Sequence, residues 1–292
     1  MFSDKDISKS IQGITTKINP NTEIKLSVVI VAFRSKGILE QCIESLKRQT
    51  YKDFEVVLVD NGENDISDSS FDGLDNYQYI KMKSNVGCSP GKNIGAYHGR
   101  GEIVCFIDDD GVADENFVIE HSKAYHDYPE LIGLRGKVLP KDDQNIFNAF
   151  ASHYDLGDEI VPAFIDTETN ASFRKTNFLE AGGFSSAVLR GDSEGVTLSY
   201  QIHKLYKNKS RLIYYPSAIV YHDFAVDIKK LIKKNINQHR ARVAVTKDTP
   251  EIFEYINSFS HPRSELHYPQ NFSTRIKLGI VRRFLKIIPL FA

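Results

Sequence analysis

Strand-like apolar runs alternate with segments of helical periodicity through the N-terminal half of the chain, and this alternation limits the available folds more than any other feature. The runs at 26–33, 54–62 and 102–107 are continuous, apolar and rich in β-branched residues, as in strands that are covered on both faces. Between 37 and 49, apolar residues recur at the spacing of one helix face. Strands and helices in this order predict an α/β fold around an open, mostly parallel sheet.

The composition is that of an ordinary globular chain. Of its 292 residues, 41% are hydrophobic and 26% are charged, which excludes an intrinsically disordered protein. No run of eighteen apolar residues is present, so we expect no membrane-spanning helix. The three cysteines lack metal-ligand spacing and the N-terminus lacks an apolar signal core, which favours a reduced, cytoplasmic protein.

Charge is distributed unevenly along the chain. Residues 225–292 carry 13 Lys or Arg and 5 Asp or Glu, a net charge of +8. Because the whole chain carries −1, the first 224 residues carry −9. We therefore expect three regions: a polar N-terminal extension at 1–25, one α/β domain at 26–224, and a basic helical region at 225–292.

Acidic residues follow two of the predicted strands. Asp60 comes at the end of one strand, and Asp108, Asp109 and Asp110 follow the run at 102–107. Adjacent carboxylates repel one another, so a divalent cation, backbone amides or a basic partner must compensate them. Ligands bind beyond the carboxyl ends of parallel strands, which places both acidic groups in one crevice. A solvated turn is the alternative for an Asp- and Gly-rich stretch.

Six short motifs, in order along the chain, resemble those of the family 2 glycosyltransferases, which have the GT-A fold. They are SVVIVAF at 27–33, VLVDNG at 57–62, NVGCSPGKNIG at 85–95, FIDDD at 106–110, NASFRK and AGGF within 170–184, and IVYH at 219–222. The resemblance covers roughly residues 25–223. It implies metal-dependent, inverting transfer of a sugar from a nucleotide-sugar, with a UDP-sugar favoured, to a glycan or lipid-linked acceptor in polysaccharide or cell-surface glycan synthesis. Residues 26–110 would then bind the nucleotide and 111–224 the acceptor.

The resemblance also implies roles for individual residues. Asp110 and His222 would bind Mn²⁺ or Mg²⁺, since oxygen ligands suit both ions and Mn²⁺ also accepts imidazole. Asp108 would hydrogen-bond the ribose, Asp60 would read the base, and Lys92 would lie near the base or phosphates. The full set of expected donor-binding residues is Ala32, Phe33, Asp60, Asn85, Lys92, Asp108 and Asp109. Taken alone, His222 fits a satisfied core histidine better than a ligand, and the acidic cluster is what makes it a candidate metal ligand.

The segment at 190–201 departs from the family pattern where a general base is expected. Aligned on Leu198, Glu194 falls on the family's Glu, but Gly195 replaces the usual Asp. A base removes the proton of the acceptor hydroxyl during attack. We take Glu194 as the first candidate and Asp192 as the second. Both acids can also simply begin a helix, where the helix dipole favours negative charge.

Three other classes of protein remain open. A degenerate transferase that binds a nucleotide or a partner without turnover is compatible with Gly195. A haloacid-dehalogenase-type phosphatase matches IDDDGV at 107–112, but that family's motif follows its first strand, and the motif at 85–95 would be unexplained. A Rossmann dehydrogenase is disfavoured because glycines at 87, 91 and 95 do not have Gly-x-Gly-x-x-Gly spacing.

The C-terminal region at 228–292 reads as basic and amphipathic. Its last segment, RIKLGIVRRFLKIIPLFA, mixes basic and apolar residues and contains no acid. Such a helix can lie on an anionic membrane surface, here at the inner face of the membrane, or pack on the catalytic domain with a solvated basic face. We do not expect nucleic-acid binding, because the basic residues lack interleaved stacking aromatics.

Overall fold

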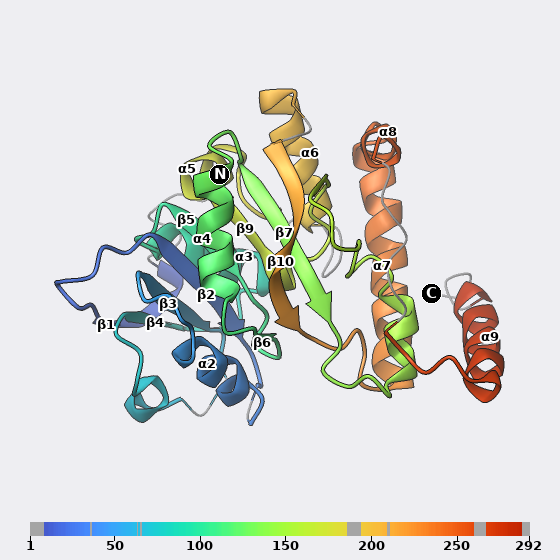
Figure 1. The fold of residues 1–292 in the computed structure, drawn as a ribbon, viewed down its shortest axis with the longest axis horizontal. Coiled ribbons are helices and arrows are strands. Elements are labelled where there is room, and N and C mark those ends of the chain that lie inside the picture. The colour runs from blue at the N-terminus through green and yellow to red at the C-terminus, as the bar shows by residue number, and fades with distance from the viewer. Residues whose placement is uncertain are drawn as a thin grey trace.

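The computed structural model describes residues 9–35, 37–62, 64, 66–185, 194–208, 211–259 and 267–287. These residues form one mixed sheet with helices on both faces and three C-terminal helices at one side (Figure 1). The strands are β1 (Ile11–Lys17), β2 (Leu26–Ala32), β3 (Phe54–Asp60), β4 (Tyr77–Met82), β5 (Ile103–Phe106), β6 (Val112–Ala113), β7 (Gly133–Leu139), β8 (Val161–Pro162), β9 (Ala171–Arg174) and β10 (Leu212–Tyr221).

The helices fall in the connections between strands and after the last strand. The α-helices are α2 (Leu39–Lys47), α3 (Cys88–His98), α4 (Phe117–Asp127), α5 (Lys175–Glu180), α6 (Glu194–Tyr206), α7 (Ile228–Asp248), α8 (Ile252–Asn257) and α9 (Phe272–Ile287). Short 3-10 helices are η1 (Asp68–Phe71), η2 (Ile146–Phe150) and η3 (Glu168–Asn170). The expected α/β fold with a helical C-terminal region is confirmed.

The strand order places the carboxyl ends of distant strands at one edge of the sheet. The order is β1-β4-β3-β2-β5-β9-β7-β10-β6, with β8 paired to β10. Strands β4, β3, β2 and β5 are mutually parallel, and β9 is antiparallel to both β5 and β7. Because β10 is parallel to β7, it runs in the same direction as β5. The residues that follow β3, β5 and β10 therefore share one edge.

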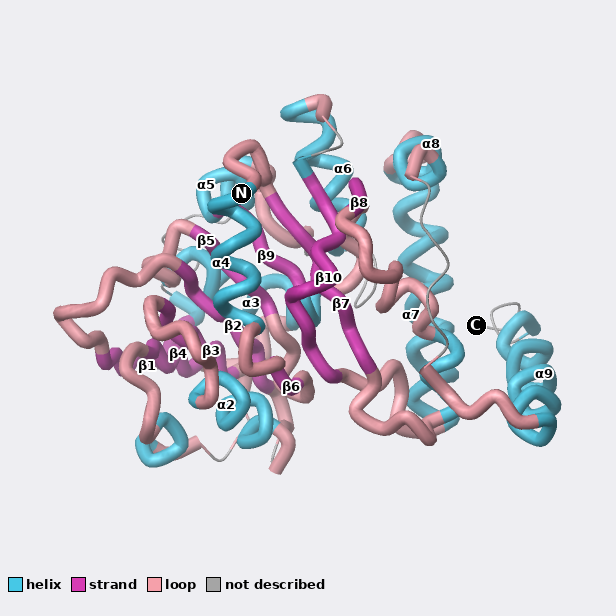
Figure 2. The backbone as a smooth tube through the Cα atoms, viewed as in Figure 1, coloured by secondary structure: helices cyan, strands magenta, loops and turns pink. Residues whose placement is uncertain are grey.

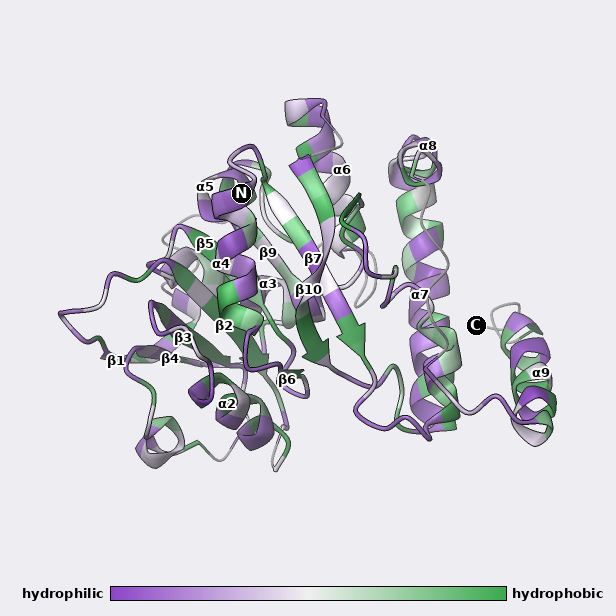
Figure 3. Ribbon diagram, in the orientation of Figure 1, coloured by the Kyte–Doolittle hydropathy of each residue, from purple (hydrophilic) through white to green (hydrophobic). Residues whose placement is uncertain are grey.

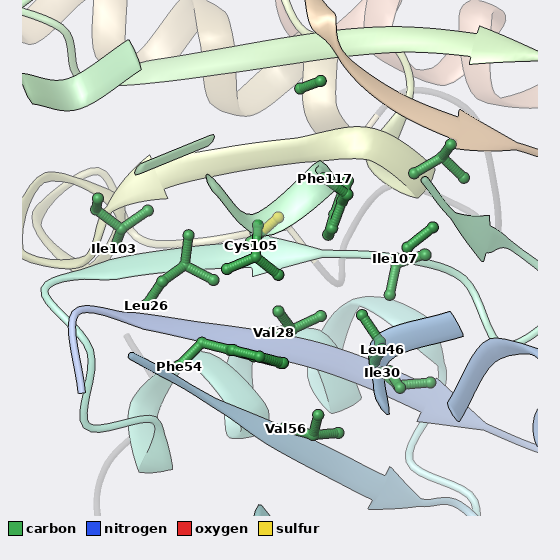
Figure 4. Close-up of a cluster of buried hydrophobic side chains, with 14 of the residues drawn as sticks. Leu26, Val28, Ile30, Leu46, Phe54, Val56, Ile103, Cys105, Ile107 and Phe117 are labelled. Atoms are coloured by element: carbon green, nitrogen blue, oxygen red, sulfur yellow. The ribbon is translucent and has the colours of Figure 1, made fainter. Parts of the chain in front are cut away.

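Helices cover both faces of the sheet, as the strand sequences predict. Val28 and Cys105 face the side covered by α2 and α4, where they pack with Leu46 and Phe117 (Figure 4). Val29, one residue along β2, faces the opposite side with residues of α3, α5 and α6. Strands buried on both faces explain why their sequences are continuous apolar runs rather than alternating ones.

Strands β1 and β7 are the longer strands that were not predicted from the sequence. The polar extension contributes β1, which pairs antiparallel with β4 at the sheet edge and exposes most of its side chains, so it carries no apolar signal. Strand β7 is buried but contains two glycines and an arginine. A side chain at Gly136 would overlap Ala218 O and the Asn170 amide, and the buried Arg135 is ion-paired with Asp166. Close backbone approach and a buried ion pair thus replace the apolar pattern.

The C-terminal helices pack against the segment between β7 and β9, which lies largely in loop conformation beside the sheet (Figure 2). Leu231 of α7 and Leu285 of α9 join a buried cluster with Val138, Tyr154 and Phe224. Among the described residues, no helix is both long enough and apolar enough to cross a membrane.

Candidate active site

Three potential metal ligands converge at the shared edge of the sheet. Asp108 and Asp110 follow β5, and His222 follows β10. One ligand atom from each residue lies within 4.8 Å of the others. Nε2 of His222 is 3.0 Å from Oδ1 of Asp110. The structure thus brings together the carboxylates and the histidine that the sequence motifs singled out, because β6, which follows Asp110 closely, pairs with the last residues of β10.

The chemistry of these three residues fits a divalent cation. Two carboxylates and an imidazole form a donor set that Mn²⁺ accepts. Burial opposes ionisation of Asp110, but the hydrogen bond and charge of His222, together with Lys141, outweigh it and lower the pKa of Asp110 to about 2. Asp110 is therefore ionised at neutral pH, as a metal ligand must be. Nδ1 of His222 is buried and has no hydrogen-bond partner among the described residues.

Lys92 links the acidic cluster to helix α3. Its Nζ lies 3.0 Å from Oδ1 of Asp108, and its side chain is buried. Burial lowers the pKa of Lys92, but the negative charge of Asp108 outweighs this effect, so the net pKa is raised and the ammonium stays charged. A Cβ at Gly91 would lie 2.8 Å from a Val31 methyl carbon, so this glycine allows α3 to pack closely on β2. The close packing brings Lys92 to the strand ends.

The first residues of the expected donor site lie around the ends of β2 and β3. Asp60 is buried, and its Oδ1 accepts hydrogen bonds from Gly62 N at 2.8 Å and from Asn64 Nδ2 at 2.6 Å. The hydroxyl of Tyr79 donates to Oδ2 of Asp60 at 2.7 Å. Asp60 thus organises the turn after β3, and its expected reading of the base stays a prediction.

At the end of β2, the side chain of Ala32 is buried, whereas that of Phe33 is exposed to solvent. Ala32 is fully buried and offers its carbonyl oxygen to Asn64 Nδ2 at 3.0 Å. The Phe33 ring is partly exposed, with the Arg34 guanidinium carbon 4.9 Å from its centroid. An exposed aromatic face of this kind can stack on a planar ligand. Asn85 is exposed and accepts from Gly87 N at 2.8 Å, which shapes the turn into α3.

Asp109 contacts the loop after β2 and is not part of the cluster of Asp108, Asp110 and His222. The Ser35 hydroxyl donates to Oδ2 of Asp109, and Phe33 N approaches the same oxygen at 3.4 Å. Burial and the charges of Asp110 and Asp108 raise the pKa of Asp109 to about 6, although the Ser35 hydrogen bond lowers it. Asp109 therefore holds the loop after β2 in place. Its expected contact with a donor stays a prediction.

Of the two candidate bases, the structure describes only Glu194. Asp192 lies outside the described residues. Glu194 begins α6, is only 7% exposed, and accepts from the Ser89 hydroxyl at 3.1 Å. This contact joins α6 to the first turn of α3. Its role as the base stays a prediction.

A cavity of about 720 Å³ opens beside the acidic cluster. Asp108 and His222 line it on one side, and the segment 164–169 contributes two further carboxylates, Asp166 and Glu168. Helix α7 lines another side with polar and basic residues: Lys234, Asn235, Gln238, His239 and Arg242. Glu194 is not among the residues that line it. The acids at 166 and 168 were not singled out from the sequence, although both directly precede the motif NASFRK.

Residues 27–190, more than half of the chain, match the family described as Glycosyl transferase family 2. The chain belongs to glycosyltransferase family 2. This membership confirms the resemblance carried by the six motifs and excludes the phosphatase and dehydrogenase alternatives. The family 2 match ends before β10, so the position of His222 is supported by the structure rather than by the match.

One curated relative is the glucosyl-dolichyl phosphate glucuronosyltransferase of Haloferax volcanii, 24% identical over 177 residues. The match spans 56% of this chain and 56% of that protein, so it covers little more than half of the relative's length.

Two solved structures share the fold of this family 2 protein. The mannosyltransferase PcManGT of Pyrobaculum calidifontis, in complex with GDP-Man and Mn²⁺, has a TM-score of 0.58 at 17% identity, covering 96% of this chain and 74% of that one. S. aureus TarS, in complex with UDP-GlcNAc, has a TM-score of 0.56 at 16% identity, covering 80% and 71%. At these identities, the similarity shows a GT-A-like fold and no more.

Proposed function

We propose that this protein transfers a sugar from a nucleotide-sugar to a glycan or lipid-linked acceptor, with inversion and with a divalent cation. The observation that carries the proposal is the convergence of Asp108, Asp110 and His222 beside the cavity. These residues would hold Mn²⁺ or Mg²⁺, which when bound stabilises the charge of a leaving nucleoside diphosphate. Lys92 adds a positive charge beside Asp108, close to where the diphosphate would lie.

For the donor we propose a UDP-sugar bound along the ends of β2 and β3. Solved relatives of the same fold are in complex with UDP-GlcNAc and with GDP-Man, so nucleotide-sugars of two bases are compatible with the fold. Phe33 would flank the base, Asp60 would read it through the turn that it organises, and Asp108 would bond the ribose.

For the acceptor we propose a lipid-linked glycan presented at the inner face of a membrane. The name of the Haloferax relative refers to a dolichyl phosphate, an acceptor class that lies in membranes. Helix α9 packs on the domain through Leu278 and Leu285 but leaves a second apolar row exposed. Within this row, Phe272 is 78%, Ile280 is 64% and Phe284 is 53% exposed.

The charge of α9 supports an anionic lipid surface as the partner that would cover this row. The helix contains five Lys or Arg and no acid (Figure 3 shows apolar and polar residues alternating along it at the outer edge). Basic residues beside exposed aromatic and aliphatic side chains are complementary to anionic lipid. The C-terminal region was expected either to pack on the catalytic domain or to lie on a membrane. We propose that α9 does both, with one face packed on the domain and another facing a bilayer.

A thermal-shift titration tests the proposed function. Purified protein is titrated with UDP, GDP, dTDP and CDP, with and without Mn²⁺. We expect a shift with one nucleotide that depends on Mn²⁺, since a ligand at a hundredfold its dissociation constant stabilises a fold by about 2.7 kcal/mol. Asp110→Asn serves as the matched control and should lose the metal-dependent part. If no nucleotide shifts the wild type, the proposed function fails; a shift without turnover would favour the degenerate, binding-only protein.

A further inference from the structure

Gly195 stands where the family usually has an aspartate, yet the space in front of it already holds a carboxylate. A Cβ built on Gly195 would lie 2.6 Å from Oε1 of Glu168 and 2.7 Å from Ile165 O. A side chain at position 195 therefore cannot coexist with the observed position of Glu168. The carboxylate that residue 195 lacks is replaced, in the same place, by one from another segment of the chain.

The structure holds the Glu168 carboxylate in a defined orientation. Gly195 N donates a hydrogen bond to Oε1 of Glu168 at 2.6 Å. Gly195 is the second residue of α6, so the carboxylate also lies at the positive end of a helix of thirteen residues. A charge-assisted bond from a backbone amide is strong and fixes the position of one carboxylate oxygen.

The element that carries Glu168 is anchored to the strands that carry the metal ligands. Asn170, at the other end of η3, is fully buried and donates to Lys137 O at 2.8 Å and to Ala218 O at 2.9 Å. Lys137 belongs to β7, and Ala218 belongs to β10, the strand that leads to His222. Glu168 is thus fixed relative to His222 through backbone contacts of the sheet. A reacting group needs this kind of support.

The cavity shows which carboxylates face the reaction space. Among the described residues that line it, Asp108 is paired with Lys92 and belongs to the metal cluster. Asp166 is ion-paired with the buried Arg135 guanidinium. Glu168 lines the same cavity, and its carboxylate is oriented by the Gly195 amide. Glu194, in contrast, is buried against Ser89 away from the lining.

We propose that Glu168 is the general base of the transfer, an inference that rests on the proposed function. Its carboxylate takes the proton from the acceptor hydroxyl while the hydroxyl oxygen forms a bond to the anomeric carbon. The bond from that carbon to the diphosphate oxygen breaks, and its electron pair leaves with the nucleoside diphosphate. The proton remains on Glu168 and passes to water after the products dissociate. This proposal places the base on η3, whereas the family pattern places it at the start of α6.

The test compares Glu168→Gln with Glu194→Gln in the full chain. Gln at 168 keeps its size and can still accept from Gly195 N through its carbonyl oxygen. Nucleoside diphosphate release is measured with Mn²⁺, using UDP-glucose, UDP-N-acetylglucosamine and GDP-mannose as donors and octyl glucoside or water as acceptor. The exposed Glu159→Gln is the matched control. We expect Glu168→Gln to lower the turnover number by about 10²- to 10⁴-fold, the usual contribution of a general base.

Each remaining outcome has a definite meaning. In Glu168→Gln, the Mn²⁺-dependent thermal shift with nucleotide should equal that of the wild type, and Glu168→Asp should retain more turnover than Glu168→Gln. Turnover within threefold of the wild type in Glu168→Gln, or loss of the nucleotide shift, overturns the base assignment while the proposed function stands. Loss of turnover in Glu194→Gln alone assigns the role to Glu194. A wild type that shows neither shift nor release refutes both proposals.

Discussion

Replacement of Asn170 by aspartate should destabilise the protein strongly, although the two side chains have the same shape. Asn170 ends a buried chain of hydrogen bonds in which the donor and acceptor of each bond are fixed by the next one. Its Nδ2 donates to two backbone carbonyl oxygens, so its Oδ1 must accept from Nε2 of His121 at 3.0 Å. Nδ1 of His121 then accepts from Ser172, at 2.8 Å, and Ser172 accepts from the Tyr125 hydroxyl at 3.1 Å. Burial lowers the pKa of His121 to about 4, so the chain is neutral at pH 7.

The size of the effect follows from the donors that are lost. An aspartate at 170 has no N–H to offer, and two buried carbonyl oxygens lose their partner. Each unsatisfied buried acceptor costs about 1–3 kcal/mol, which predicts a loss of about 2–6 kcal/mol in the free energy of unfolding. Nε2 of His121 can still donate to the new carboxylate, so this contact does not add to the loss. For a protein of this size, about 4 kcal/mol corresponds to a fall of roughly 8–16 °C in melting temperature.

Differential scanning fluorimetry at pH 7 measures the change. The control is Asn21→Asp, which makes the same chemical change at an exposed turn and should alter stability by less than about 0.5 kcal/mol. Because Glu168 is carried by the same short helix, Asn170→Asp should also lower turnover below the melting transition. A melting temperature within 2 °C of the wild type would refute the reasoning, since it would mean that the two carbonyl groups find other donors.

Three further predictions concern the metal site, pH and the membrane. Asp110→Asn should abolish the Mn²⁺-dependent thermal shift with nucleotide and lower turnover by about 10²-fold or more; Mn²⁺ titration followed by calorimetry would show whether a weak site persists. Burial also lowers the pKa of His153 to about 4, so His121 and His153 stay neutral in the fold while the unfolded chain binds protons below about pH 6.5. Stability should therefore fall as the pH decreases from 6.5 to 4, and His153→Gln should show a shallower fall in melting temperature; equal slopes would contradict this. Finally, Phe272→Ser with Phe284→Ser should reduce flotation with phosphatidylglycerol vesicles and leave the low binding to phosphatidylcholine vesicles unchanged, whereas unchanged flotation would argue against docking through α9.

The parts of the fold that could be predicted from the sequence are those in which burial is uniform. Strands β2, β3 and β5 are covered on both faces, so their sequences are mostly apolar, and the acidic residues at the ends of β3 and β5 were visible by contrast. Asp108 and Asp110 could be singled out because three adjacent carboxylates require compensation. His222 became a candidate through the family resemblance, and the pairing of β6 with the end of β10 explains why it meets the aspartates.

What could not be predicted depends on contacts between distant segments. Strand β7 escaped notice because a buried ion pair and close backbone contacts replace apolar side chains at Arg135 and Gly136. Local sequence gives no sign that Glu168 fills the space beside Gly195, since 27 residues separate them. The orientation of Asp109 toward Ser35 was likewise beyond reach, because adjacent aspartates in a turn can point in opposite directions.

The ligands of the proposed metal site are synthesised at different times, because His222 follows Asp110 by 112 positions. The strands that carry them are held apart in the sheet by β9 and β7. A chain that ends before β10 has the aspartates without this imidazole, which under the proposed function would help to hold the cation. The charges of the acidic loop would then be compensated only in part, by Lys92. Tight binding of the cation would thus report that β10 has paired in the sheet, and we expect a chain interrupted before that point to be more sensitive to a protease.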